Sequence, residues 1–241
     1  MIRTIVWFLY FGILLLGTLP NLLRVKSYQA QGQIEKHDLL TNKVTTRWAR
    51  ALLRAAGARV VVQGEKKIPA NQPVVFVSNH QGNFDIPLLL GYIPTPKAFV
   101  AKIELSKFPI VSNWMKQMKC VFMDRADIRQ SLSVINQSAN YLKQGYSTVL
   151  FPEGTRSKGN KMGEFKAGSL KLAQKAGVPI VPVAINGSYK LMEQQGFKIK
   201  PATVTITILD PIATKDLSKD QMRDLPEKIQ SMIEQKLIEN A

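Results

Sequence analysis

Short apolar runs alternate with amphipathic stretches from residue 59 to the C-terminus, and this alternation restricts the fold more than any other feature. Runs rich in Val, Ile and Phe are typical of buried strands. They occupy residues 59–64, 74–78, 97–101, 121–123, 148–151, 179–185 and 203–209. Helices are predicted between and after them, at residues 86–90, 130–144, 168–176 and 222–237. The alternation predicts an α/β fold with a mixed, mostly parallel sheet flanked by helices, in which residues 203–209 form an edge strand.

One of these strands ends in a pattern suited to proton transfer. The strand at residues 74–78 is followed by His80, and Asp85 comes five residues later, with the turn formers Gly82 and Asn83 between them. Open α/β sheets place their chemistry at such strand ends. A neutral imidazole can accept a proton from a hydroxyl, and a carboxylate on its other nitrogen fixes the tautomer. His80 and Asp85 are therefore candidates for a general base and its partner; the alternative is a pair that only caps a turn or a helix N-terminus.

A second strand end carries groups suited to an anionic ligand. The strand at residues 148–151 leads into Glu153, Gly154, Thr155 and Arg156. Glycine lets the backbone approach a ligand closely, and a hydroxyl with a guanidinium fork supplies donors suited to phosphate. This loop is a candidate phosphate site, and a turn with an exposed arginine is the alternative.

The N-terminal region has a long uncharged run. It extends from Thr4 to Leu23 and is bounded by Arg3 and Arg24. A bilayer span needs about 20 apolar residues, and this run reaches that length only with its Gly, Thr, Pro and Asn residues. A cleaved signal peptide is the alternative, but no small-x-small site clearly follows the apolar core. We expect a retained membrane helix that spans the bilayer or dips into one leaflet.

The next stretch, His37–Ala56, has the periodicity of an amphipathic helix. Its apolar face carries Val44, Trp48, Ala51, Leu52 and Ala55, and its basic face carries Lys43, Arg47, Arg50 and Arg54. Such a helix can lie among lipid headgroups; a soluble helix packed on the core is the alternative. We favour a hydrophobic plus amphipathic helix pair for membrane attachment, residues 1–58, ahead of a catalytic domain at residues 59–241. His37 is expected to be exposed in the polar connection between the two helices.

The formal net charge of +16 favours a polyanionic partner. Residues 1–70 contain 11 Lys and Arg but 3 Asp and Glu, so half of the excess adjoins the apolar run. This distribution favours an anionic lipid surface over nucleic acid, for which the chain has no recognised signature. Cys120 is the single cysteine, which excludes an intramolecular disulfide, and its apolar surroundings predict a buried, inert thiol. The chain has neither a zinc-ligand cluster nor a Walker loop, so no metal or nucleotide is expected.

Four stretches together resemble the glycerophospholipid acyltransferase family, and within it the bacterial 1-acyl-glycerol-3-phosphate acyltransferases (lysophosphatidic acid acyltransferases). They are NHQGNFD (79–85), AKIELSKFP with VFMDR (101–109 and 121–125), FPEGTRS (151–157) and VPIVPVAI (178–185). The resemblance covers residues 74–185, and its motifs are specific in combination. Gly82 stands where many members carry serine, and Ser112 where many carry glycine, which leaves substrate preference more open.

The resemblance implies acyl transfer from acyl-CoA or acyl-carrier protein to the sn-2 hydroxyl of lysophosphatidic acid, giving phosphatidic acid, with no other cofactor. It assigns the general base to His80, with Asp85 as its partner, and phosphate binding to Arg156 and Lys102. Glu153 would hold the loop or a glycerol hydroxyl. Arg125 either reaches the site or pairs with a neighbouring aspartate. The donors are cytosolic, so the catalytic domain is expected on the cytoplasmic side of the cell membrane.

Other functions are kept as alternatives. The same chemistry could act on glycerol 3-phosphate or another lysophospholipid. A non-enzymatic protein that binds membranes or nucleic acid would also be basic. A serine hydrolase would need an activated serine, and the chain has no G-x-S-x-G nucleophile elbow.

Overall fold

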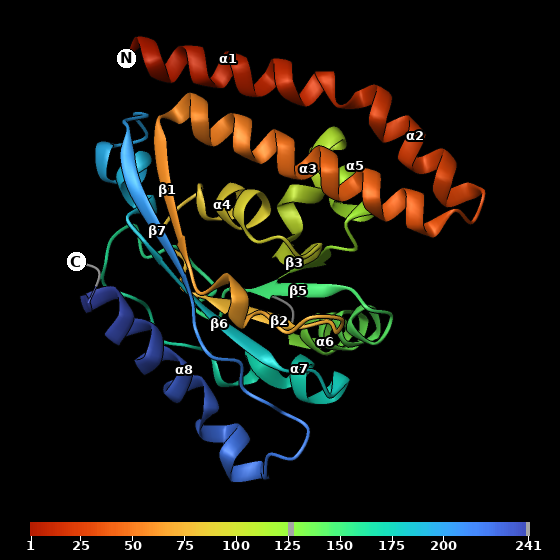
Figure 1. Cartoon of the computed structure of the whole chain (residues 1–241), viewed down its shortest axis with the longest axis vertical. Helices are drawn as coiled ribbons and strands as arrows, with labels where there is room; N and C mark the ends of the chain where they lie inside the picture. The colour runs from red at the N-terminus through yellow and green to blue at the C-terminus, as the bar shows by residue number, and fades with distance from the viewer. Residues whose placement is uncertain (125–127, 240–241) are drawn as a thin grey trace.

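The computed structural model describes residues 1–124 and 128–239, and its centre is a seven-stranded sheet (Figure 1). The strands are β1 (Ala58–Gln63), β2 (Val75–Ser78), β3 (Lys97–Lys102), β4 (Val121–Met123), β5 (Ser147–Leu150), β6 (Ile180–Asn186) and β7 (Ala202–Ile208). Their order across the sheet is β1-β7-β6-β2-β5-β3-β4. Every residue of β2 and β5 is buried, which explains why these central strands are almost continuously apolar.

The predicted mixed, mostly parallel sheet is confirmed. The β6–β7 pairing is antiparallel, and the other five strand pairings are parallel. The prediction that residues 203–209 form an edge strand was wrong, because β7 lies between β1 and β6. Its alternating sequence has a different cause: Thr203 is exposed and Thr205 half-buried, while Val204 and Ile206 are fully buried. One face of β7 is thus partly open, although both of its hydrogen-bonding edges are paired.

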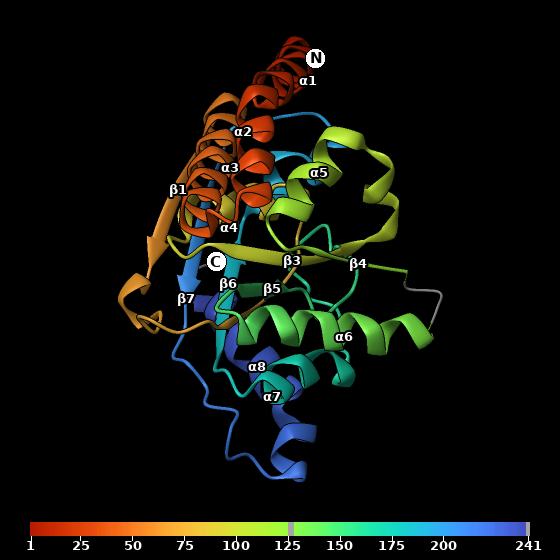
Figure 2. The same ribbon diagram turned by 90° about the vertical axis from the view of Figure 1, so that its right-hand side faces the viewer.

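Helices cover both faces of the sheet (Figures 1 and 2). One side carries α3 (Ile34–Ala56), α4 (Asp85–Tyr92) and α5 (Pro109–Gln117). The other side carries α6 (Ile128–Lys143), α7 (Lys171–Ala176) and α8 (Lys219–Glu239). The helix predicted at residues 168–176 is divided into a 3-10 turn, Ala167–Leu170, and the short α7. Two apolar clusters fill the spaces between the sheet and these layers, so that the sheet is a rigid platform for the loops at its edges.

The N-terminal run forms α1 (Ile2–Gly17) and α2 (Leu19–Ala30), which follow each other along the outside of α3 (Figure 1). Pro20 lacks the N–H of a regular helical bond, so the division at Thr18 has a local cause. Residues 2–30 are long and apolar enough to cross a membrane by length and composition, and an 18-residue window within them has a mean hydropathy of 1.9. Most of this surface is not covered by protein: Ile5, Leu9 and Ile13 are more than 60% exposed.

Helix α3 is amphipathic as predicted, and its apolar stripe packs against the protein core. Leu52 and Leu53 are buried in the core, and the indole N–H of Trp7 in α1 donates to the Leu52 carbonyl at 3.0 Å. The exposed side of α3 carries Lys43, Arg47 and Arg54. The alternative of a helix packed on the core, with its basic face outward, describes α3 correctly.

The expectation that His37 is exposed was also wrong, because its side chain is 1% exposed. Helix α3 begins at Ile34, so His37 lies in its first turn and faces α5. Its Nε2 lies 2.9 Å from Oε1 of Gln117, and its Nδ1 lies 2.7 Å from Oδ1 of Asp38. The predicted helix began at His37, three residues after the observed start at Ile34. For this reason His37 was assigned to the connection, although it is buried within the helix.

Candidate active site

The site lies where neighbouring parallel strands end. Strands β2, β5 and β3 are adjacent and parallel, so their carboxyl ends meet at one edge of the sheet. His80 follows β2, Gly154 and Arg156 follow β5, and Lys102 is the last residue of β3. The topology therefore brings together side chains that are far apart in the sequence.

His80 and Asp85 are in direct contact. Nδ1 of His80 lies 2.6 Å from Oδ2 of Asp85, which also accepts the backbone N–H of Gly82 at 2.8 Å. The Asp85 side chain is fully buried, whereas that of His80 is 15% exposed and lines a cavity. Because Nδ1 is engaged by the carboxylate, Nε2 is the ring nitrogen left for a second partner. The carboxylate closes the turn and orients the ring at the same time.

The plane of the imidazole is fixed by Phe151. The two rings are stacked with 4.1 Å between centroids and an interplanar angle of 21°. Phe151 is the residue after β5, so the stack is a direct result of the β2–β5 pairing. Sequence reasoning treated Phe151 only as the end of a strand, because its partner is on another element.

The residues on either side of His80 anchor its loop to β6. The Asn79 amide donates to the Ile185 carbonyl at 2.9 Å and accepts the Ile185 N–H at 2.8 Å. Oε1 of Gln81 accepts the backbone N–H of Gly187 at 2.9 Å and that of Ser188 at 3.2 Å. Both amides are fully buried. Sequence reasoning missed them; the signal was the presence of two amides flanking a histidine directly after a buried strand.

The loop after β5 pairs with the His80 loop. Ser157 N–H donates to the His80 carbonyl at 2.8 Å, and Lys158 N–H donates to the Gln81 carbonyl at 3.1 Å. Gly154 has a φ of +69°, a backbone conformation that residues with a side chain rarely adopt. It makes the tight turn that returns the chain to this pairing. The two candidate loops therefore form one unit.

Glu153 lies beneath this unit and is 5% exposed. Its Oε1 accepts the backbone N–H of His80 at 2.6 Å, and its Oε2 accepts that of Gly163 at 2.8 Å. Burial raises the pKa of Glu153, and the two N–H donors act in the opposite direction. The side chain braces backbone and does not line the cavity.

Cationic and hydroxyl groups gather beside His80. Arg156, Thr155 and Lys102 line the same cavity as His80, and Gly154 contributes to its wall. Arg156 is half-buried, and its Nη1 donates to Oδ1 of Asn83. The remaining predicted site residue, Arg125, lies outside the described residues.

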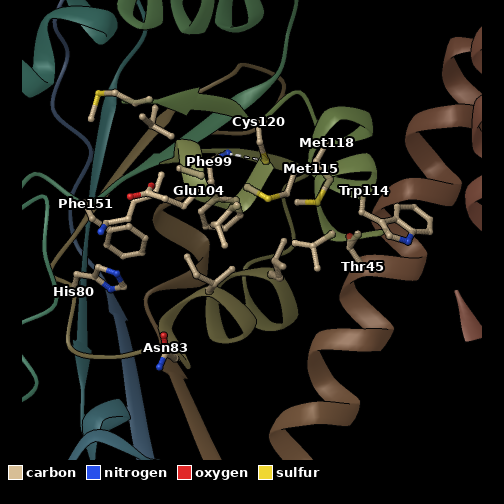
Figure 3. Close-up of a pocket in the computed structure, with 18 of the residues that line it drawn as sticks. Thr45, His80, Asn83, Phe99, Glu104, Trp114, Met115, Met118, Cys120 and Phe151 are labelled. Atoms are coloured by element: carbon tan, nitrogen blue, oxygen red, sulfur yellow. Dashed lines mark hydrogen bonds between the residues drawn. The ribbon is translucent and has the colours of Figure 1, made fainter. Parts of the chain in front are cut away.

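Away from His80 the cavity is apolar. Its volume is about 430 Å³, and it extends from His80 and Phe151 towards Thr45 and Trp114, between α3, α4, α5 and β3 (Figure 3). Apolar side chains line it: Leu90, Phe99, Trp114, Met115, Met118 and Cys120. The Cys120 thiol accepts the Phe99 N–H at 3.3 Å, and burial raises its pKa to about 12, so it stays protonated and inert as predicted.

Within residues 1–124 and 128–239, no group of three or more His, Cys, Asp or Glu side chains is arranged to hold a metal ion. The titratable side chains that line the cavity are the His80 imidazole, the Cys120 thiol, the exposed Glu104 carboxylate and the Lys102 and Arg156 cations, while the carboxylates of Asp85 and Glu153 are buried behind His80. The arrangement is suited to moving a proton at one point and binding an anion next to it.

Known proteins are similar to this chain in sequence and in fold. A profile of the family described as Acyltransferase matches residues 59–186. A protein of Mycoplasma genitalium named probable 1-acyl-sn-glycerol-3-phosphate acyltransferase is 40% identical over 189 residues, which are 76% of this chain and 69% of that protein. A protein of the same name from Mycoplasma pneumoniae is 34% identical over 194 residues, which are 76% of this chain and 70% of that protein.

A solved structure agrees over almost the whole chain. The crystal structure of the 1-acyl-sn-glycerophosphate (LPA) acyltransferase from Thermotoga maritima superposes with a TM-score of 0.78 at 27% identity, covering 99% of this chain and 97% of that one. The predicted resemblance and the predicted fold class are thus confirmed. The chain belongs to the acyltransferase family and is an acyltransferase.

Proposed function

We propose that this acyltransferase moves a fatty acyl group from an acyl thioester to the sn-2 hydroxyl of 1-acyl-glycerol-3-phosphate, giving phosphatidic acid. The names of its relatives support this acceptor. The observation that carries the proposal is the position of His80, between a cluster of cations and a long apolar cavity. An acyl thioester has an apolar chain and a polar reacting end, and the acceptor carries a phosphate.

The general base in this proposal is His80. Nε2 takes the proton of the acceptor hydroxyl as its oxygen attacks the thioester carbonyl carbon. The tetrahedral intermediate then expels the thiolate, which takes the proton from the imidazolium. Asp85 keeps the ring in the required tautomer and stabilises the imidazolium, which is consistent with the 2.6 Å contact at Nδ1. A positioned base contributes about 10²–10⁴-fold to the rate.

The acceptor phosphate is assigned to Arg156 and Lys102, with Thr155 and the Gly154 backbone completing the site. A guanidinium binds phosphate through two parallel N–H groups, and an ammonium adds a point charge. All four residues line the cavity beside His80, which supports the assignment. Arg125 remains a predicted contributor.

The apolar part of the cavity is proposed to hold the acyl chain of the donor, which is acyl-CoA or acyl-carrier protein. No other cofactor and no metal enters the proposed reaction. Glycerol 3-phosphate or another lysophospholipid is the alternative acceptor. Membership of the acyltransferase family sets aside the non-enzymatic alternatives of a membrane-binding or nucleic-acid-binding protein.

Helices α1 and α2 are proposed to attach the enzyme to the cell membrane, with residues 59–241 as the catalytic domain on the cytoplasmic side. The apolar surface of α1, which includes the exposed Ile5, Leu9 and Ile13, supports this attachment. The exposed basic side of α3 is then available to anionic headgroups. The cytoplasmic side follows from the proposed donors, which are cytosolic.

The proposal is tested with membranes containing the protein and a labelled acyl thioester. Lysophosphatidic acid, lysophosphatidylcholine and glycerol 3-phosphate are offered in parallel, and the products are identified. Wild type is expected to form phosphatidic acid, and Arg156→Ala to raise the KM for lysophosphatidic acid at least about tenfold. Arg223→Ala, at an exposed arginine of α8, is the matched control. Product on another acceptor would replace the proposed substrate, and no transfer to any acceptor would contradict the proposal.

A further inference from the structure

Glu193 reaches the turn between His80 and Asp85 from outside all four motifs. It opens the 3-10 turn Glu193–Gln195, which follows β6 at the same edge of the sheet. Its Oε1 accepts the backbone N–H of Asn83 at 2.7 Å across 110 positions of sequence. An acidic side chain thus fixes the backbone of the turn that carries the candidate base and its partner.

The contact continues through Asn83 to Arg156. The side-chain oxygen of Asn83 accepts from Nη1 of Arg156, and its Nδ2 lies 3.5 Å from the sulfur of Met192, the residue before Glu193. Asn83 and Arg156 line the cavity, whereas Glu193 does not. Glu193 therefore acts on a ligand indirectly, and the asparagine that it holds at the backbone links it to Arg156.

The carboxylate has room because residue 82 is glycine. A Cβ on Gly82 would lie 2.3 Å from Oε2 of Glu193, which is shorter than any real contact of this kind. Oε2 is buried and has no hydrogen-bond partner among residues 1–124 and 128–239. Leaving a carboxylate oxygen unpaired is costly, and burial correspondingly raises the pKa of Glu193. An apolar side chain would avoid this cost but would leave the Asn83 N–H without its acceptor, so the carboxylate is explained by its hold on Asn83.

We infer that Glu193 is a positioning residue for the acceptor phosphate: it holds Asn83 so that the Asn83 side chain presents the Arg156 guanidinium to the ligand, and Gly82 supplies the space. The inference rests on the proposed function, because it takes Arg156 as a phosphate-binding group. It makes residues 82 and 193 a coupled pair. A change at residue 82 that displaces the carboxylate and a change at residue 193 that removes it have the same consequence, which is a misaligned Arg156.

The coupling supplies the experiment. Glu193→Ala removes the carboxylate, and Gly82→Ala displaces it, since the carboxylate is the flexible end of a side chain. Glu193→Gln keeps an oxygen for the Asn83 N–H in a side chain of the same size. Gln194→Ala, at the exposed neighbour in the same turn, is the control. For each protein and for the double variant Gly82→Ala/Glu193→Ala, the Kd for lysophosphatidic acid is measured by calorimetry in detergent. The KM for each substrate, kcat and the melting temperature accompany it.

We expect the variants to weaken binding of lysophosphatidic acid while the KM for the thioester stays nearly unchanged. Glu193→Ala raises the Kd and KM for lysophosphatidic acid about tenfold. It leaves kcat and the thioester KM within about twofold, because His80 keeps its own anchors at Glu153 and Asp85. Gly82→Ala raises the Kd in the same way, and the double variant is no weaker than the weaker single variant. Glu193→Gln restores most of the affinity. A role limited to packing would lower the melting temperature without this difference between the two substrates.

Two results separate this inference from the proposed function. If Arg156→Ala weakens lysophosphatidic acid binding but Glu193→Ala does not, Glu193 does not position the arginine and only the inference is wrong. If Arg156→Ala leaves the Kd unchanged, the phosphate assignment fails and the inference fails with it. Additive effects of Gly82→Ala and Glu193→Ala would also overturn the coupling.

Discussion

The backbone N–H of His80 donates to Oε1 of Glu153 at 2.6 Å, although the two residues are 73 positions apart. The second oxygen of the same carboxylate accepts the Gly163 N–H at 2.8 Å. Glu153 thus ties the His80 loop to two parts of the loop after β5. The position of the imidazole depends on a carboxylate that does not line the cavity.

Replacing this carboxylate by an amide should affect both stability and turnover. Glu153→Gln keeps one acceptor oxygen but turns an N–H₂ donor towards a backbone N–H donor. A buried group left unsatisfied costs about 1–3 kcal/mol, so urea unfolding in detergent should show a loss of that size. We also expect kcat to fall at least about tenfold, because the base moves relative to its target. Glu164→Gln, at an exposed glutamate of the same loop, is the control, and unchanged stability and kcat in Glu153→Gln would refute the bracing role.

Removing the charge of Asp85 should act on the rate and not on binding. Asp85→Asn preserves an oxygen for the Gly82 N–H but no longer stabilises an imidazolium at Nδ1. We expect kcat to fall at least about a hundredfold with both substrate KM values little changed. The measurement is steady-state kinetics of wild type and Asp85→Asn. Asp210→Asn, at an exposed aspartate after β7, is the control. A loss smaller than about threefold would show that Asp85 only closes the turn.

The far end of the cavity should determine which acyl chains fit. Met118 lies near Trp114 and Thr45, remote from His80 (Figure 3). Met118→Trp fills that end, so we expect the preferred thioester to become shorter by two or more carbons while the shortest substrates keep their kcat. The measurement is a competition among thioesters of graded length, and Phe197→Trp, at an exposed surface position, is the control. An unaltered chain-length profile would place the acyl chain elsewhere.

A buried amine predicts how stability changes with pH. Lys97 is 6% exposed, its Nζ donates to the Ile93 carbonyl at 2.8 Å, and burial lowers its pKa from 10.5 to about 7. Between these pH values the unfolded chain binds a proton that the folded protein does not, so this lysine makes stability rise with pH. The slope is about 1.4 kcal/mol per pH unit at most, and the contribution is least favourable below pH 7.

Lys97→Met should therefore remove that slope. Unfolding free energies are measured from pH 6.5 to 9.5 for wild type, Lys97→Met and Lys66→Met, the last being a change at an exposed lysine. The stability of Lys97→Met relative to wild type is expected to be greatest at pH 6.5 and to decline towards pH 9.5. A pH-independent difference would mean that Lys97 is neutral, or charged, in both states throughout.

Contacts that are local in sequence could be predicted, and contacts between distant segments could not. His80 and Asp85 are five positions apart beside a strong strand signal, so their pairing followed from the turn between them. Glu153, Gly154, Thr155 and Arg156 follow a second strand, and parallel pairing brings the two strand ends together. Glu193 reaches Asn83 across 110 positions, and no pattern in the chain indicates that distance.

The wrong predictions have a common physical cause. An alternating strand shows that one face is open, but it does not show whether its edges are paired, so β7 was assigned to the edge of the sheet. An amphipathic helix shows which face avoids water, but it does not show whether protein or lipid covers that face, so the packing of the α3 apolar stripe on the core could not be predicted. Periodicity shows which residues are buried, but it does not show which element or surface covers them.

The central claim is that His80 takes the proton of the acceptor hydroxyl. Its most direct test is the kcat for phosphatidic acid formation by His80→Ala beside wild type, at saturating thioester and lysophosphatidic acid, with equal membrane content and matching thermal unfolding. The account predicts a loss of at least about a hundredfold with the Kd for lysophosphatidic acid retained. Equal kcat in the two proteins would contradict it.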